Sequence, residues 1–276
     1  MSEPRSLPAP AALLRPAGLL LGLVVVVLLF LQHPSLAQLF AGVALFLLGM
    51  RYLEDGFRAF TGGALERWLA ASTDRLWKSL TFGTLSTALV QSSSLITLLS
   101  IAFLSAGLIS LTAGIGIVFG ANLGTTTGAW LIALVGLKLD LAQVGMPLLV
   151  FGVVLERNRQ ARWRGTGQVL LGIGLLFLGI DQMKAGFAGL DQVFDLAAYQ
   201  VEGWRGIALY ALLGTLATVL MQSSHATLMI TLAALASGQL DYSNALAMAV
   251  GANLGTTVTA LIAALGANNA GRQLAA

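Results

Sequence analysis

The chain contains no cysteine and very little charge. Only 10% of its 276 residues are Asp, Glu, Lys or Arg, whereas 57% are hydrophobic, and the mean hydropathy is +0.85. Without cysteine there is no disulfide framework and no thiolate metal site. Soluble domains carry about 25% charged residues, so a water-soluble fold of this size could not cover its surface. The sequence therefore predicts an integral membrane protein, with the lipid bilayer as its surroundings.

The few charges are unevenly placed along the chain. No Asp, Glu, Lys or Arg lies between Ser79 and Leu137, and none lies between Gly206 and Leu240. The formal net charge is +3, but no run rich in Lys and Arg with interleaved aromatic residues is present. Basic residues gather in cytoplasmic loops of membrane proteins. Nucleic acid is therefore not an expected partner.

An internal repeat divides the chain into two halves. A shift of 131 positions places Gln91 of one "QSS" on Gln222 of another, and Gly120 of "GANLGTT" on Gly251 of an identical heptapeptide. Over residues 83–134, 21 of 52 positions match the second copy. Such a repeat arises by duplication of a packing unit, and transporters also use repeats to form a substrate site at their interface. We assign an N-terminal tail (1–16), repeat 1 (17–137), repeat 2 (138–267) and a C-terminal tail (268–276).

Each half shows the same series of apolar segments. Because lipid offers no partner to backbone polar groups, these segments are expected to be helical. The first one, which follows Arg5 and Arg15, also resembles a signal peptide. It occupies the same place as residues 140–156 in repeat 2, so we interpret it as a retained helix. The expected segments are 17–32, 36–53, 79–108 and 111–136, then 140–156, 166–181, 206–239 and 242–266, with polar connectors at 54–78 and 182–205.

The topology depends on the two QSS segments, each of which is either one membrane crossing or a re-entrant hairpin. With hairpins, the N-terminus, the connector 54–78, the loop 157–164 and the C-terminus lie on one side of the membrane. That side then holds twelve of the 15 basic residues, as the positive-inside rule requires of the cytoplasmic side. We therefore predict an all-α membrane protein of two inverted-topology repeats, each with a re-entrant QSS helical hairpin and a broken GANLGTT helix, and a cytoplasmic N-terminus.

A hairpin tip at membrane depth provides ligands for both an anion and a cation. The helix that starts there exposes N–H groups and the positive end of its dipole, which favour an anion. The helix that ends there exposes carbonyl groups, while Ser and Gln donate and accept hydrogen bonds. A buried, unpaired anion is very costly, and the sequence places no fixed positive charge near these tips. We therefore expect cation-coupled anion symport.

The GANLGTT segments permit two interpretations. Two glycines around Asn suggest a helix break or a close backbone approach. The polar residues would then add oxygen ligands: Asn122, Thr125, Thr126, Asn253, Thr256 and Thr257. Alternatively, Gly, Ala and Thr simply allow helices to pack closely.

The paired "QSSS…GANLGTTT" and "QSSH…GANLGTTV" resemble the bacterial branch of the type II sodium/phosphate cotransporter family, over residues 36–267. The resemblance implies a secondary transporter, not an enzyme, that takes up inorganic phosphate with Na⁺ by alternating access across the inner (cytoplasmic) membrane. It implies no resident cofactor and leaves a homo-oligomer open. The implied phosphate and ion ligands are Gln91, Ser92, Ser93, Ser94, Gln222, Ser223, Ser224 and His225, with the six GANLGTT residues in support. Na⁺ would lie near Gln91, Ser92, Gln222, Ser223, Thr126 and Thr257.

Two departures from the family pattern and three rival functions remain. His225 stands where Ser is commoner, and it would either donate to phosphate or bond to a nearby carbonyl. Many relatives continue into further helices and a soluble helical domain, so this chain is either a short form or a piece of a longer protein.

The alternative functions are a channel or carrier for another oxyanion and a non-transporting membrane protein. An intramembrane hydrolase using Ser224 and His225 is disfavoured, because neighbours on a helix point apart and no G-x-S-x-G elbow is present.

Overall fold

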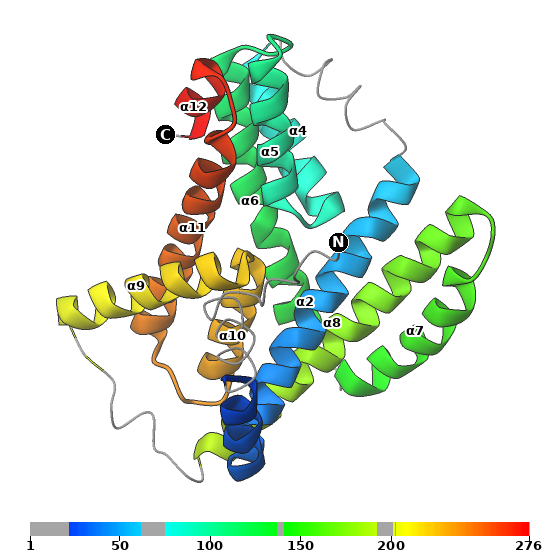
Figure 1. Ribbon diagram of the computed structural model, residues 1–276, viewed down its shortest axis with the longest axis vertical. Coiled ribbons are helices and arrows are strands. Elements are labelled where there is room, and N and C mark those ends of the chain that lie inside the picture. The colour runs from blue at the N-terminus through cyan, green and yellow to red at the C-terminus, as the bar shows by residue number, and fades with distance from the viewer. Residues whose placement is uncertain (1–21, 62–74, 137–140, 192–200, 202, 276) are drawn as a thin grey trace, which may run out of the picture.

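The computed structural model describes residues 22–61, 75–136, 141–191, 201 and 203–275, and within these ranges the ordered elements are helices without strands (Figure 1). Four of these helices are long and apolar enough to cross a membrane: α2, α8, α9 and α11. The prediction that the apolar segments form helices is thus confirmed. A helix over Gly22–Gln32 precedes α2 (Pro34–Thr61), α4 (Leu76–Val90), α5 (Ser93–Ser105), α6 (Leu111–Gly136), α7 (Leu141–Glu156), α8 (Ala161–Asp191), α9 (Gly203–Met221), α10 (Ser224–Ala236), α11 (Tyr242–Ala264) and α12 (Asn269–Ala275).

The long helices α2 and α8 form an antiparallel pair along two rows of glycine. A Cβ added to Gly42 would lie 2.7 Å from the carbonyl oxygen of Gly179, and one added to Gly49 would lie 2.8 Å from that of Gly172. The reciprocal contacts, from Gly179 to Gly42 and from Gly172 to Gly49, have the same lengths. Glycines spaced by seven residues recur on one helix face, since two turns take about 7.2 residues. They let the two backbones touch, as small residues do between membrane helices.

Helices α4, α5 and α6 form one packed unit. Gly116 lies against Leu76 and Ser79, and Gly124 lies against Thr84 and Thr87. Residue numbers thus rise together along α4 and α6, so these helices run parallel. Because α5 joins the end of α4 to the start of α6, it runs back between them, and the chain reverses direction at the QSS segment.

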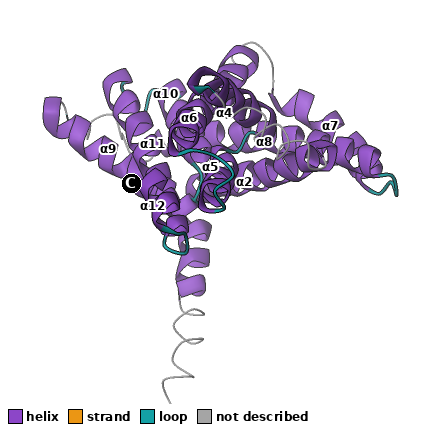
Figure 2. Ribbon diagram, turned by 90° about the horizontal axis from the view of Figure 1, so that it is seen from above, coloured by secondary structure: helices purple, strands orange, loops and turns teal. Residues whose placement is uncertain are grey.

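The same unit recurs in α9, α10 and α11 at the spacing found in the sequence. Gly214 lies against Met248, and Gly83 lies against Ile117, which is 131 positions earlier in each case. Both middle helices also end on a glycine with positive φ, 72° at Gly107 and 76° at Gly238, in the same capping pattern. The duplicated sequence therefore folds into a duplicated structure. Figure 2 shows α7 and α9 at opposite ends of the molecule with α4, α5 and α6 between them.

Two expectations about these segments are wrong. Helices α6 and α11 run unbroken through GANLGTT, because the glycines there serve helix contact: Gly120 touches the Leu80 carbonyl, and Gly251 touches that of Ala211. The packing interpretation is therefore the one that the structure supports. In addition, α2 does not end near residue 53 but continues to Thr61. The remaining parts of both connectors, 62–74 and 192–200, lie outside the described residues.

Candidate functional site: two polar helix tips facing one cavity

The first tip is formed by Gln91 and Ser92, between α4 and α5. Gln91 has a left-handed backbone (φ 57°), and its Nε2 donates to the Ala88 carbonyl at 2.5 Å. Ser92 is the N-cap of α5, and its Oγ accepts from the Leu95 N–H at 3.3 Å. Gln91 therefore ends one helix and Ser92 starts the next. The Gln-Ser pair of the QSS motif thus serves as the two caps of this helix break.

The second tip has the same geometry. Gln222 has φ 53° and donates from Nε2 to the Val219 carbonyl at 2.6 Å. Ser223 is the N-cap of α10, and its Oγ accepts from the Ala226 N–H at 3.2 Å. Among the described residues, these two glutamines are the non-glycine residues with positive φ. A bulky residue in this conformation costs on the order of 1–3 kcal/mol and is typical of functional sites.

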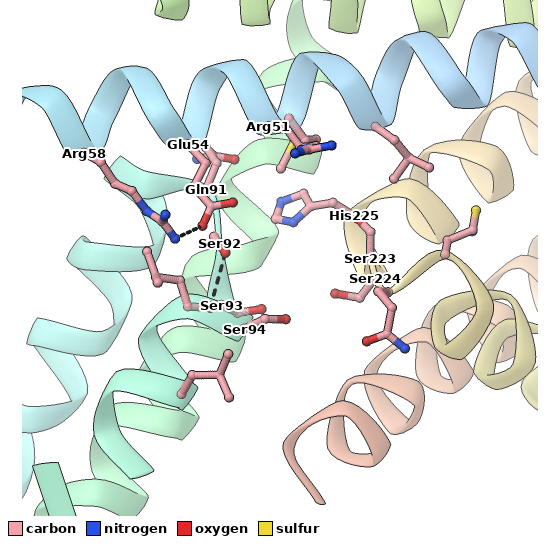
Figure 3. Close-up of a pocket in the computed structure, with 16 residues that line it drawn as sticks. Arg51, Glu54, Arg58, Gln91, Ser92, Ser93, Ser94, Ser223, Ser224 and His225 are labelled. Atoms are coloured by element: carbon pink, nitrogen blue, oxygen red, sulfur yellow. Dashed lines mark hydrogen bonds and ion pairs between the residues drawn. The ribbon is translucent and has the colours of Figure 1, made fainter. Parts of the chain in front are cut away.

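Both tips open on one cavity of about 520 Å³. Figure 3 shows the serines of the two tips facing each other across it. Ser93 and Ser224, the first residues of α5 and α10, line this cavity and are buried at 4% and 7% exposure. The first N–H groups of a helix have no acceptor within the helix. The cavity brings together, as the sequence predicts, Gln91, Ser92, Ser93, Ser94, Gln222, Ser223, Ser224 and His225.

Three charged residues of α2 complete the cavity wall, and sequence reasoning missed all of them. They are Arg51, Glu54 and Arg58. Arg58 donates to Glu54 Oε1 at 2.7 Å, one turn away on the same helix. The expectation of a site without fixed positive charge is therefore wrong. The signal was present in the sequence. Leu47 and the three charged residues follow one another at intervals of three or four positions, which places them on one face of a helix.

His225 is buried between the two halves, at 5% exposure. It donates to the backbone carbonyl of Thr125, while its Nε2 has no hydrogen-bond partner. The bond must therefore come from Nδ1. A carbonyl partner of this kind is one of the two roles that the sequence left open for this residue.

Gly128 lies at the point where the two halves meet. A Cβ added to it would lie 2.5 Å from Gln91 Oε1 and 2.8 Å from His225 Nε2. The missing side chain leaves room for both polar atoms, one from each half. Figure 3 shows His225 next to Arg51, and Gln91 beside Glu54 at the other tip.

The GANLGTT residues lie apart from this cavity. The hydroxyls of Thr125, Thr126, Thr256 and Thr257 donate to carbonyls one turn back in their own helices. Asn122, Thr256 and Thr257 line a second cavity of about 410 Å³ beside α12, together with Thr97. Thr125 is buried, whereas Asn253 and Thr126 are exposed. None of them lines the cavity between the two tips, while the Thr125 carbonyl accepts from His225 and Thr256 lines a small cavity with Ser94. A role in Na⁺ binding stays a prediction.

The arrangement suits an anion that is bound and released. Two helix N-termini, the serine hydroxyls and an arginine converge on a cavity at the interface of a structural repeat. Helix N-termini and Arg are the protein's ordinary ligands for phosphate and carboxylate groups. Repeats with polar helix breaks at their interface are typical of secondary transporters. The fold and the site therefore define the class of transporter-like membrane proteins.

Comparisons with known proteins agree with this class. The model of the Na⁺/Pi-cotransporter family matches residues 45–185 and 203–273. A Salmonella typhimurium protein named "Putative inorganic phosphate export protein YjbB" is 32% identical over 243 residues, which cover 87% of this chain and 44% of that protein. The protein of the same name from Escherichia coli K12 is 31% identical with the same coverage. The Bacillus subtilis "Uncharacterized protein YqeW" is 28% identical, with 84% of this chain and 74% of that protein covered. No protein of solved structure matches the chain.

The chain belongs to the Na⁺/Pi-cotransporter family. The resemblance seen in the paired QSS and GANLGTT motifs is thereby confirmed. The chain spans less than half the length of the YjbB proteins that it matches.

Proposed function

We propose that this protein is a sodium-coupled symporter of inorganic phosphate that works by alternating access. The observation that carries the proposal is the shared cavity between the tips of α4–α5 and α9–α10. Each tip directs a helix N-terminus and its serines at the same space, so one tetrahedral anion can contact both halves at once. A ligand held by both halves is released when they move relative to each other.

Phosphate fits this cavity in charge and in hydrogen-bonding geometry. The free N–H groups of the first turns of α5 and α10 and the hydroxyls of Ser93, Ser94 and Ser224 supply donors. Arg51 supplies a fixed positive charge on the cavity wall. Arg58 is paired with Glu54, so that pair adds little net charge. Inorganic phosphate carries one to two negative charges near neutral pH, as phosphate groups generally do. A co-bound cation is still needed to balance it.

Sodium ions would bind where α4 and α9 end. The last carbonyls of a helix lack intrahelical donors and carry the negative end of its dipole, and hard cations prefer oxygen ligands. The carbonyl oxygens of these helix ends, with the side chains of Gln91 and Gln222, offer such ligands next to the anion. Each ion then lowers the cost of burying the other.

Reciprocal contacts between the halves support the inverted repeat. His225 lies against Gly128, and the equivalent residues, Ser94 and Thr259, line one small cavity together. The glycine contacts of α2 with α8 exchange in the same way. Such exchange is the mark of an approximate two-fold axis. In Figure 1, α6 descends from the top and α11 rises toward it, as an axis in the membrane plane requires, and the QSS reversals then are re-entrant hairpins.

The positive-inside rule orients the molecule. The cavity opens beside the end of α2 that carries Arg51 and Arg58. We assign this side to the cytoplasm, with the N-terminus cytoplasmic and the protein in the inner membrane. The described conformation then is the one open to the cytoplasm.

The net direction of transport has two candidates. Coupling to the inward sodium gradient gives phosphate uptake. The names of the YjbB proteins speak of phosphate export for those relatives, and the same carrier would run outward if phosphate accumulated inside. The direction of transport then depends on the sodium and phosphate gradients, since a symporter is reversible.

Radiolabelled phosphate uptake into liposomes containing the purified chain tests the proposal. We expect uptake with an inward Na⁺ gradient and little with an equal K⁺ gradient, and excess unlabelled phosphate should compete better than sulfate. The double variant Ser93→Ala, Ser224→Ala should lose most of this uptake, while Ser110→Ala, at the distant α6 cap, serves as the matched control. Equal uptake with both cations would refute sodium coupling. Full activity of the double variant would refute the site.

A further inference from the structure

One carboxylate faces the anion cavity, and phosphate binding as described above does not use it. Glu54 lies on the cavity wall, and its side chain is only 26% exposed. Figure 3 shows it reaching from α2 toward the first tip, beside Gln91. Asp55, the next residue, is exposed and is not part of this wall. A negative group beside a bound anion is unfavourable unless a hydrogen atom or a cation lies between the two.

The two oxygens of the Glu54 carboxylate have different surroundings. Oε1 accepts a hydrogen bond from Arg58 at 2.7 Å, one turn along the same helix. Oε2 accepts no hydrogen bond from the part of the chain that the structure describes. Arg58 holds the carboxylate in place and already offsets its charge, so a second cation would gain little there. What remains open is one strong hydrogen-bond acceptor beside the anion.

We propose, on the basis of the function proposed above, that Glu54 determines the specificity of the cavity by accepting a hydrogen bond from a protonated oxygen of the anion. Near neutral pH inorganic phosphate carries one to two negative charges and so keeps at least one O–H group, whereas sulfate keeps none. An ionised carboxylate only accepts hydrogen bonds. It therefore pairs with phosphate through that O–H and meets sulfate as a like charge. The substrate class is then the protonated tetrahedral oxyanions, phosphate and arsenate.

The other groups around the cavity do not make this distinction. The helix N-termini and Arg51 only donate hydrogen bonds, and they serve any tetrahedral anion of this size. The serine hydroxyls turn to suit either ligand, because they both donate and accept. A group that is left without its partner by the wrong ligand rejects that ligand far more strongly than a small difference in size does. The one carboxylate on the wall is therefore the group that separates phosphate from sulfate.

The alternative is a purely structural ion pair between Glu54 and Arg58. Pairs at this spacing on a solvated helix face contribute little to stability, and they need no cavity. A structural pair predicts that removal of the negative charge alters stability and leaves the choice between anions as it was. A specificity determinant predicts the reverse, so the two roles are separated by measuring both quantities on the same variants.

The test is competition for sodium-driven uptake of radiolabelled phosphate into liposomes at neutral pH. The competitors are sulfate, arsenate and monofluorophosphate, which has the shape and charge of divalent phosphate with fluorine in place of the hydroxyl group. Arsenate should compete nearly as well as unlabelled phosphate. Sulfate and monofluorophosphate should compete about tenfold to a hundredfold more weakly, as the loss of one hydrogen bond to a charged group predicts. Equal competition by monofluorophosphate and phosphate would overturn the proposal without any variant.

Glu54→Gln is the decisive variant. Its amide keeps the size of the side chain and one acceptor, and it adds a donor that sulfate can accept from. The ratio of the sulfate to the phosphate inhibition constant should therefore fall about tenfold to a hundredfold. Asp55→Asn removes the same charge one position along α2 and is the matched control, with an unchanged ratio. Melting temperatures in detergent show that both variants fold; if Glu54→Gln does not, the monofluorophosphate result decides.

Four outcomes overturn the inference or its basis. An unchanged ratio in Glu54→Gln removes this carboxylate from specificity, and an equal fall in Asp55→Asn shows a general effect of charge. A higher Na⁺ concentration for half-maximal uptake in Glu54→Gln, with the ratio unchanged, makes the carboxylate a sodium ligand instead. The same competition is measured as equilibrium binding of phosphate to the purified protein, so that the anion preference is read even if uptake proves independent of sodium, which would refute the proposed coupling alone. Absence of phosphate binding refutes both the proposed function and the role of Glu54.

Discussion

Gln91 and Gln222 hold the same left-handed backbone conformation, with φ of 57° and 53°, at equivalent positions of the two halves. Each ends one helix and directs its side-chain amide back to that helix. Glycine would adopt this conformation without strain. The structure thus has a costly residue twice at equivalent positions of the candidate site, as expected if the amide is needed for binding.

Replacing Gln91 with Gly should therefore separate stability from function. Relief of the left-handed strain should leave the melting temperature in detergent unchanged or raised. The strain relieved is about 1–3 kcal/mol of unfolding free energy. The greater flexibility of glycine in the unfolded chain offsets part of this gain. Loss of the amide should reduce phosphate uptake. A variant that melts lower and transports normally would contradict this view of the tip.

Replacing Ser92 with Asp tests whether the tip binds an anion. The carboxylate can cap α5 as Ser92 does, so thermal stability should be retained. A fixed negative charge at the cavity should abolish phosphate uptake. Ser110→Asp is the matched control, because Ser110 Oγ accepts from the Ala113 N–H at 3.2 Å away from the cavity. Equal uptake by both variants would exclude an anion at this tip.

Replacing Arg51 with Gln should weaken phosphate binding. Hydrogen bonds to a charged group contribute about 1.5–3 kcal/mol, so the KM for phosphate should rise about 10- to 100-fold. Arg157→Gln, in the exposed turn after α7, should leave it unchanged. The measurement is initial uptake rate against phosphate concentration, and an unaltered KM in Arg51→Gln would place this arginine outside the binding site.

Replacing Gly49 with Ala should destabilise the α2–α8 pair. The new Cβ would lie 2.8 Å from both the Gly172 carbonyl oxygen and the Leu176 nitrogen, and both are backbone atoms that cannot turn away. Overpacking of this kind costs about 1–3 kcal/mol. Gly266→Ala is the control, since no atom lies within 4 Å of its added Cβ. Thermal unfolding in detergent should show a lower midpoint for the first variant only.

The repeat also supplies a matched pair of threonines. Thr218 Oγ1 and Thr227 Oγ1 form a buried hydrogen bond of 2.8 Å, whereas Thr87, the equivalent of Thr218, has a buried hydroxyl without a partner. Thr218→Val removes this bond while Thr227 Oγ1 keeps the Ser223 carbonyl at 3.3 Å, so it should cost about 0.5–1.5 kcal/mol, the net value of one hydrogen bond. Thr87→Val leaves no other polar group without a hydrogen-bond partner, so it should be neutral or stabilising. The two melting temperatures, measured side by side, decide this; a larger loss in Thr87→Val would show that its hydroxyl has an unseen role.

The sequence predicted the membrane class, the repeat and the cavity serines, because each depends on local chemistry or on identity between the halves. It did not predict the charged cavity wall of α2, because Glu54 and Arg58 follow Leu53 in a stretch that resembles a connector when hydropathy alone is considered, and Arg51 lies just before it. Their spacing along one helical face was the better guide. It also assigned the glycines of GANLGTT to a break, since glycine favours both breaks and close contact, and only the neighbouring helix decides between them.

The glycine rows of α2 and α8 restrict which length changes the gene can tolerate. The contacts of Gly42 and Gly49 repeat at a spacing of two helical turns. One residue inserted between them would rotate every later position by about 100° and turn a side chain into the backbone of α8. Insertions and deletions should therefore accumulate in the connectors and be excluded from these two helices, whatever their effect on hydrophobicity.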